Sequence, residues 1–182
     1  LLDLDKLACG KLELELRDQS LMPIVEDAIA LNMRFAAEYR VSLALSSSYD
    51  CWVHVDVRRL HQILANFLSN AAKFSPFNSE VDISVMPVGE MVRIAIRDLG
   101  PGIKDDFKDH LFTRFSQGDG SDRRRNSGTG LGLAISKELA LAMKGKIGCI
   151  SKPAHGSTFY LDLPCRPADL QRPAAPQLRE VS

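Results

Sequence analysis

The sequence predicts an α/β (α+β) two-layer sandwich, in which a mixed and mostly antiparallel sheet carries its helices on one face. The first observation is a strongly amphipathic helix expected between residues 56 and 76, where apolar side chains recur at helical spacing. The second is two pairs of strand-forming segments, at 80–97 and 146–163, each divided by a short turn. Such turns indicate antiparallel pairing, and the helices then cover the apolar face of the sheet.

The composition is that of an ordinary globular domain. Apolar residues make up 45% and charged residues 25% of the 182 residues, enough to bury one full core. The 23 basic residues balance the 23 acidic ones, so charge does not indicate a nucleic-acid or membrane partner. Four scattered cysteines without C-x-x-C spacing predict reduced thiols in a cytosolic protein rather than a zinc site: Cys9, Cys51, Cys149 and Cys165. Because the first residue is Leu1, we expect a segment of a longer protein.

The first third of the chain is predicted to hold a helix end, one complete helix and three strands. Leucines with heptad-like spacing at 1–7 predict the end of a longer helix that closes at Gly10. Ser20 is expected to cap a helix that runs to about Tyr39. Its inward side chains are expected to be Ile24, Ala28, Leu31, Phe35 and Tyr39. The expected strands are 11–17, 41–45 and 51–55.

The helix between Asp56 and Pro76 has two distinct faces. Its buried stripe is expected to be Leu60, Ile63, Leu64, Phe67, Leu68, Ala71 and Phe74. A second stripe, formed by Asn66, Asn70 and Lys73, places two amides and one ammonium on a single face. A solvated helix face explains this stripe for most helices. The alternative is a site in which amide oxygens meet Mg²⁺ and the lysine meets a phosphate group.

The second half alternates strands with polar breaks. Four strands are expected, at 80–87, 91–97, 146–151 and 157–163. A long polar loop at 116–129 is expected to form a lid, and Gly130 is expected to open a helix that ends near Lys144. The inward residues of that helix are expected to be Leu131, Ile135, Leu139 and Met143. The proline-rich composition from Pro164 onward predicts a tail or linker.

Two glycine-punctuated segments could serve a ligand. Gly128, Gly130 and Gly132 lie where the polar loop becomes a helix, and backbone amides at such a place attract phosphate. Asp98, followed by Gly100 and Gly102, could accept a hydrogen bond from an exocyclic amine beside a flat ring. A flexible loop end and a plain turn are the better explanations of these two segments when each is considered alone. The loop arginines Arg123, Arg124 and Arg125 could reach phosphate or remain solvated, and a solvated cluster explains any single one at least as well.

The order of these segments resembles the catalytic, ATP-binding domain of sensor histidine kinases. Four boxes follow one another: N-x-x-x-N-A-x-K-F at 66–74, D-x-G-x-G-I at 98–103, F-x-x-F at 112–115 and G-x-G-L-G-L at 128–133. The resemblance implies the Bergerat ATP-binding fold. It also implies the end of a dimerisation helix or linker at 1–10, a catalytic domain at 11–164 and a tail or linker at 165–182.

The resemblance also implies a role for each matched position. Asp98 would accept the adenine amino group, Asn70 would ligate Mg²⁺, and Asn66 and Lys73 would act on the phosphates. The nucleotide contacts would be Asn66, Asn70, Lys73, Asp98, Gly100, Gly102, Ile103, Phe115, Arg125, Gly128, Thr129, Gly130, Leu131 and Gly132. Related ATPases of the gyrase type carry a glutamate at the position of Asn66. An amide cannot act as that base, so the sequence favours phosphoryl transfer to a protein acceptor.

The acceptor itself is not found in the sequence. The family's phosphorylated histidine precedes an acidic residue, a basic residue and proline, and none of the four histidines has these neighbours. We therefore expect the donor half of a cytoplasmic histidine kinase, whose parent could be anchored in the inner membrane. Its expected partners are ATP, a histidine-containing dimerisation domain and a response regulator receiver, without nucleic acid or direct membrane contact. Two alternatives remain: an inactive nucleotide-binding or docking module, and a serine kinase of the anti-sigma-factor type.

Overall fold

The computed structural model describes residues 13–114 and 130–167. In chain order its elements are β1 (Arg17–Ser20), α2 (Leu21–Glu38), β2 (Ser42–Ser47), β3 (Cys51–Val55), α3 (Val57–Phe74), β4 (Glu80–Val88), β5 (Met91–Arg97), α4 (Asp105–Lys108), α5 (Gly132–Ala142), β6 (Lys146–Ser151) and β7 (Ser157–Pro167).

The strands form one mixed sheet in the order β1-β3-β7-β5-β4-β2, with β6 paired to β7. All pairs are antiparallel except β2 with β4, which are joined through α3 as a parallel pair requires. The predicted hairpin of β4 and β5 is confirmed, and the turn between them contains Gly89 at φ +61°. Strand β7 is shared: its first part pairs with β6 and its last three residues pair with β3.

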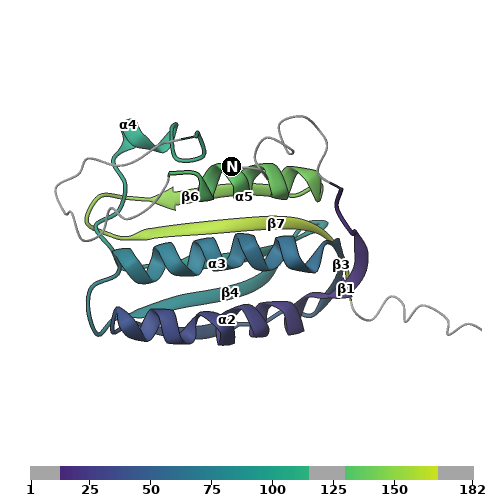
Figure 1. Cartoon of the computed structure of the whole chain (residues 1–182), viewed down its shortest axis with the longest axis horizontal. Coiled ribbons are helices and arrows are strands. Elements are labelled where there is room, and N and C mark those ends of the chain that lie inside the picture. Colours follow the sequence, from purple (N-terminus) through teal and green to yellow (C-terminus); the bar gives the residue numbers. More distant parts are fainter. Residues whose placement is uncertain (1–12, 115–129, 168–182) are drawn as a thin grey trace, which may run out of the picture.

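The molecule has the two predicted layers. In Figure 1 the helices α2, α3 and α5 lie side by side across one face of the sheet. Alternate residues of the central strands are buried against this helical layer: Val81, Ile83 and Val85 in β4, Val92, Ile94 and Ile96 in β5, and Phe159, Leu161 and Leu163 in β7. Helix α3 lies in the middle of the layer, between α2 and α5, and its inward stripe is therefore almost entirely buried.

Helix α3 begins and ends almost where the sequence predicts. Asp56 is its N-cap, and the carboxylate accepts a hydrogen bond of 3.2 Å from the backbone N–H of Arg59. Six of the seven residues expected inside are buried, but Phe74 at the last turn is 38% exposed. The prediction for Phe74 was wrong because the helix ends there, beyond the part of the core that could cover it.

The N-terminal elements depart from prediction in three places. The first strand was predicted at 11–17 but runs from Arg17 to Ser20, because its partner β3 ends at Val55 and leaves nothing for residues 13–16 to pair with. Ser20 is the N-cap of α2, but its hydroxyl donates to Asp50 at 3.0 Å and makes no side-chain capping bond. Leu31 is exposed, since the buried stripe of α2 continues from the expected Ala28 to Ala36.

Three further boundaries differ. Helix α5 begins at Gly132, not Gly130, which has φ +66° and lies in the preceding turn. Strand β7 continues to Pro167, because its end finds a second partner in β3. Strand β2 extends to Ser47, as two hydroxyls of the expected turn bond to backbone carbonyls of β4.

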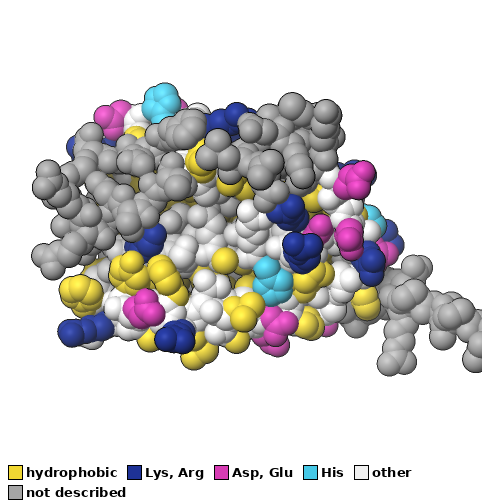
Figure 2. Space-filling view, viewed as in Figure 1, with side chains coloured by type: hydrophobic (Ala, Val, Ile, Leu, Met, Phe, Trp, Pro, Cys, Tyr) yellow, Lys and Arg dark blue, Asp and Glu magenta, His cyan; other side chains and the backbone are white. Residues whose placement is uncertain are grey.

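The helical face is chemically mixed. Figure 2, drawn from the same side as Figure 1, shows acidic, basic and hydrophobic side chains interspersed over the part that α2 and α3 form. None of the helices in the described ranges combines the length and the apolar character needed to cross a bilayer.

Candidate functional site

The candidate site is built where helix α3 packs against helix α5. Asn66 projects from α3 and donates a hydrogen bond of 3.0 Å from Nδ2 to the hydroxyl of Ser136 in α5. Its carboxamide lies directly against the α-carbon of Gly132, and a Cβ there would collide with Oδ1 of Asn66. Gly132, the third glycine of the predicted phosphate-binding segment, is therefore needed because a larger residue would collide with Asn66. This contact joins the box at 66–74 to the box at 128–133.

Asn70 and Lys73 follow Asn66 on the same face of α3, as their spacing predicts. Both are half-buried, and neither side chain makes a hydrogen bond or ion pair within the part of the chain that the structure describes. The described residues contain no group of three His, Cys, Asp or Glu side chains that could hold a metal ion. The amide oxygens of Asn66 and Asn70 are neutral ligands of the kind that suits Mg²⁺ when phosphate oxygens and water supply the other ligands.

Asp98 follows directly after β5 and is 3% exposed. Its Oδ1 accepts hydrogen bonds from the backbone N–H groups of Gly100, at 2.8 Å, and Ser157, at 3.1 Å. Burial raises the pKa of Asp98 above its usual range, and the two backbone hydrogen bonds oppose this by lowering it. Oδ2 accepts no hydrogen bond from the described residues, so one oxygen of a fixed, buried carboxyl group remains available to a ligand.

The glycines after Asp98 allow the backbone to pass close to its neighbours. A Cβ at Gly100 would lie 2.7 Å from the carbonyl oxygen of Phe74, at the end of α3. Gly102 has φ +71°, and a Cβ there would collide with the carbonyl of Lys152. The segment from Asp98 to Ile103 therefore lies against the end of α3 on one side and the β6–β7 turn on the other.

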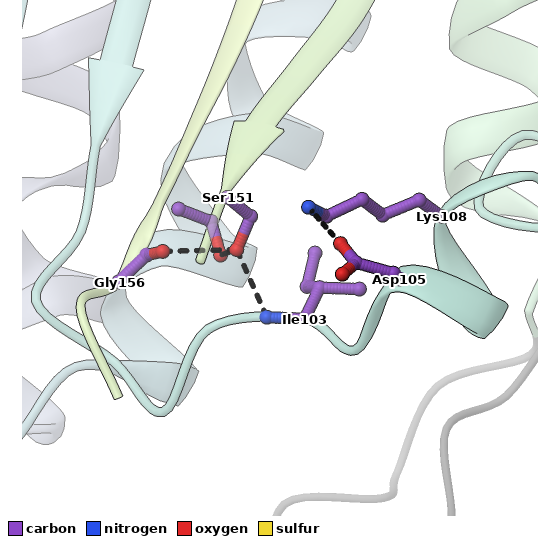
Figure 3. A network of polar contacts seen from close by, with 6 residues as sticks. Ile103, Asp105, Lys108, Ser151 and Gly156 are labelled. Carbon is purple, nitrogen blue, oxygen red and sulfur yellow. Dashed lines mark hydrogen bonds and ion pairs between the residues drawn. The ribbon is translucent and has the colours of Figure 1, made fainter. Parts of the chain in front are cut away.

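The β6–β7 turn is the part of the site that sequence reasoning missed. The hydroxyl of Ser151 donates to the carbonyl of Gly156 and accepts from the N–H of Ile103, both at 2.9 Å, as Figure 3 shows. It also lies 2.9 Å from the hydroxyl of Ser157. Ser151, the last residue of β6, pairs with Ser157, the first residue of β7, so the two serines flank the turn. Two serines at such paired positions were the sequence feature that could have indicated this network.

Beside this network lies a short ion pair. Lys108 donates to the carboxylate of Asp105 at 2.6 Å within α4, and this hydrogen bond lowers the pKa of Asp105 (Figure 3). Phe112 packs edge-on against Phe159 with ring centroids 6.5 Å apart. This contact holds the chain that follows the Asp98 segment against β7.

The described residues include only some of the predicted nucleotide contacts. Phe115, Arg123, Arg124, Arg125, Gly128 and Thr129 lie outside the described residues, as does the predicted lid. Gly130 lies in the turn before α5. The side chain of Leu131 is 8% exposed and belongs to the core, so a ligand contact there would come from its backbone.

A hollow of about 210 Å³ lies at the other end of α3 from Lys73, between β1 and the first turn of the helix. Asp56, one of its lining residues, uses one oxygen to accept from Arg59 N–H and the other to accept from Glu15 N–H at 3.1 Å. Both oxygens are thus used to fasten the N-terminal segment to α3, and this hollow is separate from the candidate site.

The arrangement suits the binding of an adenine nucleotide, and Asn66 does not provide the base that ATP hydrolysis requires. One side offers the fixed carboxyl group of Asp98, and the other offers two amides and an ammonium for phosphates. Asn66, which adjoins the start of α5, cannot take a proton from water because a carboxamide is not a base. The residues present therefore suit binding and positioning of Mg²⁺-nucleotide phosphates.

Comparison with known proteins agrees with this geometry. Residues 55–167 match the family model of the histidine kinase-, DNA gyrase B- and HSP90-like ATPases. The chain is 36% identical to the signal transduction histidine-protein kinase BarA of Escherichia coli over 89% of its length and 18% of that protein. It is 35% identical to the sensor histidine kinase AruS of Pseudomonas aeruginosa, over 91% of this chain and 17% of that protein. The chain thus spans less than a fifth of these two relatives.

Solved structures show the same architecture. Full-length ShkA, in complex with AMPPNP, aligns with 92% of this chain and 35% of its own at a TM-score of 0.79 and 29% identity. The histidine kinase AdeS of Acinetobacter baumannii aligns with 89% of this chain and 73% of its own, at a TM-score of 0.71 and 25% identity. The chain therefore belongs to the histidine kinase-, DNA gyrase B- and HSP90-like ATPase family, as an ATP-binding domain of the sensor histidine kinase type.

Proposed function

We propose that this chain binds Mg·ATP and donates the γ-phosphate to a histidine on a separate dimerisation domain. The observation that carries the proposal is the Asp98 carboxyl group, buried and fixed through Oδ1 by two backbone N–H groups, with Oδ2 left for an exocyclic amine. A nucleotide complex is known for the similar protein ShkA, which was solved with AMPPNP.

Each part of the site has a defined task in this proposal. Asp98 accepts the adenine amino group, and Gly100 and Gly102 shape the ring pocket by letting their backbone lie close to α3 and the β6–β7 turn. Asn70 is the protein ligand of Mg²⁺, which when bound neutralises charge on the phosphates. Asn66 and Lys73 orient the phosphate chain from the same face of α3. The helix thereby holds the phosphates at a fixed position relative to Asn70, the proposed Mg²⁺ ligand.

The acceptor is proposed to come from another domain. Of the described histidines, His54 is paired with Asp18 at 2.8 Å, and His155 bonds to the carbonyl of Pro153 at 2.9 Å. Neither has the acidic, basic and proline neighbours that follow the family's phosphorylated histidine. The relatives, which are far longer than this chain, include proteins named as hybrid and sensor histidine kinases. We accordingly propose a histidine-bearing dimerisation domain and a response regulator receiver as partners, on the cytoplasmic side where ATP is available.

A transfer assay tests this function. The chain is mixed with Mg²⁺, γ-labelled ATP and a separately produced dimerisation domain of a similar kinase, and the label on that domain is followed. Acid-labile, base-stable labelling is expected if histidine is the acceptor. Nucleotide binding without any transfer would favour a docking or regulatory module, and acid-stable label would favour a serine kinase. The domain with its acceptor histidine replaced by alanine is the matched control.

A further inference from the structure

Ser136 is a polar side chain inside an otherwise apolar helix contact. It is 1% exposed in α5, and residues of the same helix around it, such as Leu139 and Ala140, are fully buried core residues. The partner of its hydroxyl is Nδ2 of Asn66, 70 positions earlier in the chain and 3.0 Å away. A buried hydroxyl requires a hydrogen-bond partner, and this one is satisfied by a residue of the candidate site.

The bond anchors the Asn66 carboxamide at the start of α5. A serine hydroxyl both donates and accepts, so the bond by itself permits either orientation of the amide group. In the structure Nδ2 donates to Ser136 and Oδ1 lies against Gly132, the first residue of α5. The hydroxyl and the glycine therefore hold the carboxamide in place from two sides.

Gly132 and Ser136 act together because they stand four residues apart on α5 and so share one face. The glycine leaves room for Oδ1, and the serine holds Nδ2. We propose that Ser136 is a positioning residue, which anchors the Asn66 carboxamide at the start of α5, beside the metal and phosphate groups. The inference rests on the proposed function of Asn66, and Ser136 itself touches neither nucleotide nor metal.

Three substitutions separate this role from simple packing. Ser136→Ala removes the hydroxyl and makes the side chain smaller. Ser136→Thr keeps the hydroxyl, and Ser136→Val has the shape of Thr without it, so this pair compares the hydrogen bond at constant volume. If Ser136 served only to fill space, Thr and Val would behave alike.

The first readout needs no nucleotide. The side-chain N–H₂ group of Asn66 is observed by nuclear magnetic resonance and assigned through its disappearance in Asn66→Asp. In the unaltered chain and in Ser136→Thr we expect slow solvent exchange at this group, and in Ser136→Ala and Ser136→Val fast exchange. An Asn66 amide that is unchanged by loss of the hydroxyl would overturn the anchoring role of Ser136.

The second readout is the ratio of ADP affinities with Mg²⁺ and with EDTA, measured by calorimetry. We expect Ser136→Ala and Ser136→Val to lower the Mg²⁺-dependent affinity about five- to tenfold, as loss of one hydrogen bond implies, with little change in EDTA. In a chain that already carries Asn66→Ala, Ser136→Ala should cause no further loss. Equal losses with and without the metal, or equal effects of Thr and Val, would reduce Ser136 to a packing residue.

The two proposals fail in different ways. Absence of Mg²⁺-dependent binding in the unaltered chain would overturn the proposed function, and this role with it. Metal-dependent binding that persists undiminished in Ser136→Val would leave the proposed function standing and overturn the positioning role alone.

Discussion

Asp98 and Ser157 hold one another by two hydrogen bonds. The N–H of Asp98 donates to the carbonyl of Ser157 at 2.8 Å, and the N–H of Ser157 donates to Oδ1 of Asp98 at 3.1 Å. The two residues are 59 positions apart, so the carboxylate proposed to recognise adenine is positioned by the β6–β7 hairpin as much as by its own strand. Ser151 extends the same network to Ile103 and thus fixes both ends of the glycine segment.

Asp98→Asn is predicted to abolish nucleotide recognition while the fold is kept. Oδ1 of the amide can still accept from Gly100 and Ser157, which leaves an N–H₂ donor where Oδ2 stood, facing the amino group of adenine. We expect ADP affinity to fall about a hundredfold or more by calorimetry. Undiminished affinity in a folded variant would remove Asp98 from the adenine site.

The same substitution is predicted to alter the pH dependence of stability. Burial raises the pKa of Asp98 in the folded state, so folding becomes less favourable as pH rises from the ordinary value of 3.8 through the raised value. Asp98→Asn removes this cost at neutral pH and has nothing to remove at low pH. Melting temperatures of both chains at pH 7.5 and pH 4 should show an advantage of the variant that shrinks on acidification. An advantage that grew toward low pH would contradict the raised pKa.

Gly102→Ala is predicted to destabilise the fold strongly. The residue has φ +71°, and its α-carbon meets the carbonyl of Lys152, so an added methyl group is opposed by both backbone strain and collision. We expect the free energy of unfolding in urea to fall by about 2–4 kcal/mol.

Gly89→Ala is the matched control for that prediction. Its φ of +61° is similar, but no atom lies within 4 Å of the added Cβ. Only the strain of the left-handed conformation remains, and a loss of about 1 kcal/mol is expected. Equal losses in the two variants would show that the close approach to Lys152 contributes nothing.

The thiols of Cys51 and Cys149 are predicted to be unreactive in the folded chain. Burial raises the pKa of each to about 12, so almost no thiolate, the reactive form, exists at pH 8. Pulse alkylation with iodoacetamide, followed by peptide mass spectrometry, should label both residues in urea and neither without it. Rapid labelling of either residue in the folded chain would contradict this burial.

Local features of the sequence predicted much of the fold. Helix α3 was predictable because its apolar spacing, its Asp56 cap and its polar stripe are all encoded within one segment. The β4–β5 hairpin was predictable for the same reason, since alternation and a turn at Gly89 are adjacent in the chain.

The features that could not be predicted depend on distant partners. The start of β1 is set by the end of β3, and the end of β7 by a pairing with β3 that no pattern within 157–167 reveals. Leu31 has suitable spacing for burial, but the packing of α2 on its neighbours buries Ala28 and Ala36 and leaves Leu31 exposed. Likewise, the Asn66 stripe was visible in the sequence, while its contacts with Gly132 and Ser136 required the two helices to be placed together.

The most direct test of the account is a calorimetric titration of the chain with ADP, first with Mg²⁺ and then with EDTA, repeated for Asn70→Ala. The account predicts binding that weakens when the metal is removed, and an Asn70→Ala variant that loses affinity with Mg²⁺ but matches the unaltered chain in EDTA, because Asn70 acts only through the metal. Absence of binding in both conditions would contradict the nucleotide site, and an equal loss in EDTA would contradict the metal role of Asn70.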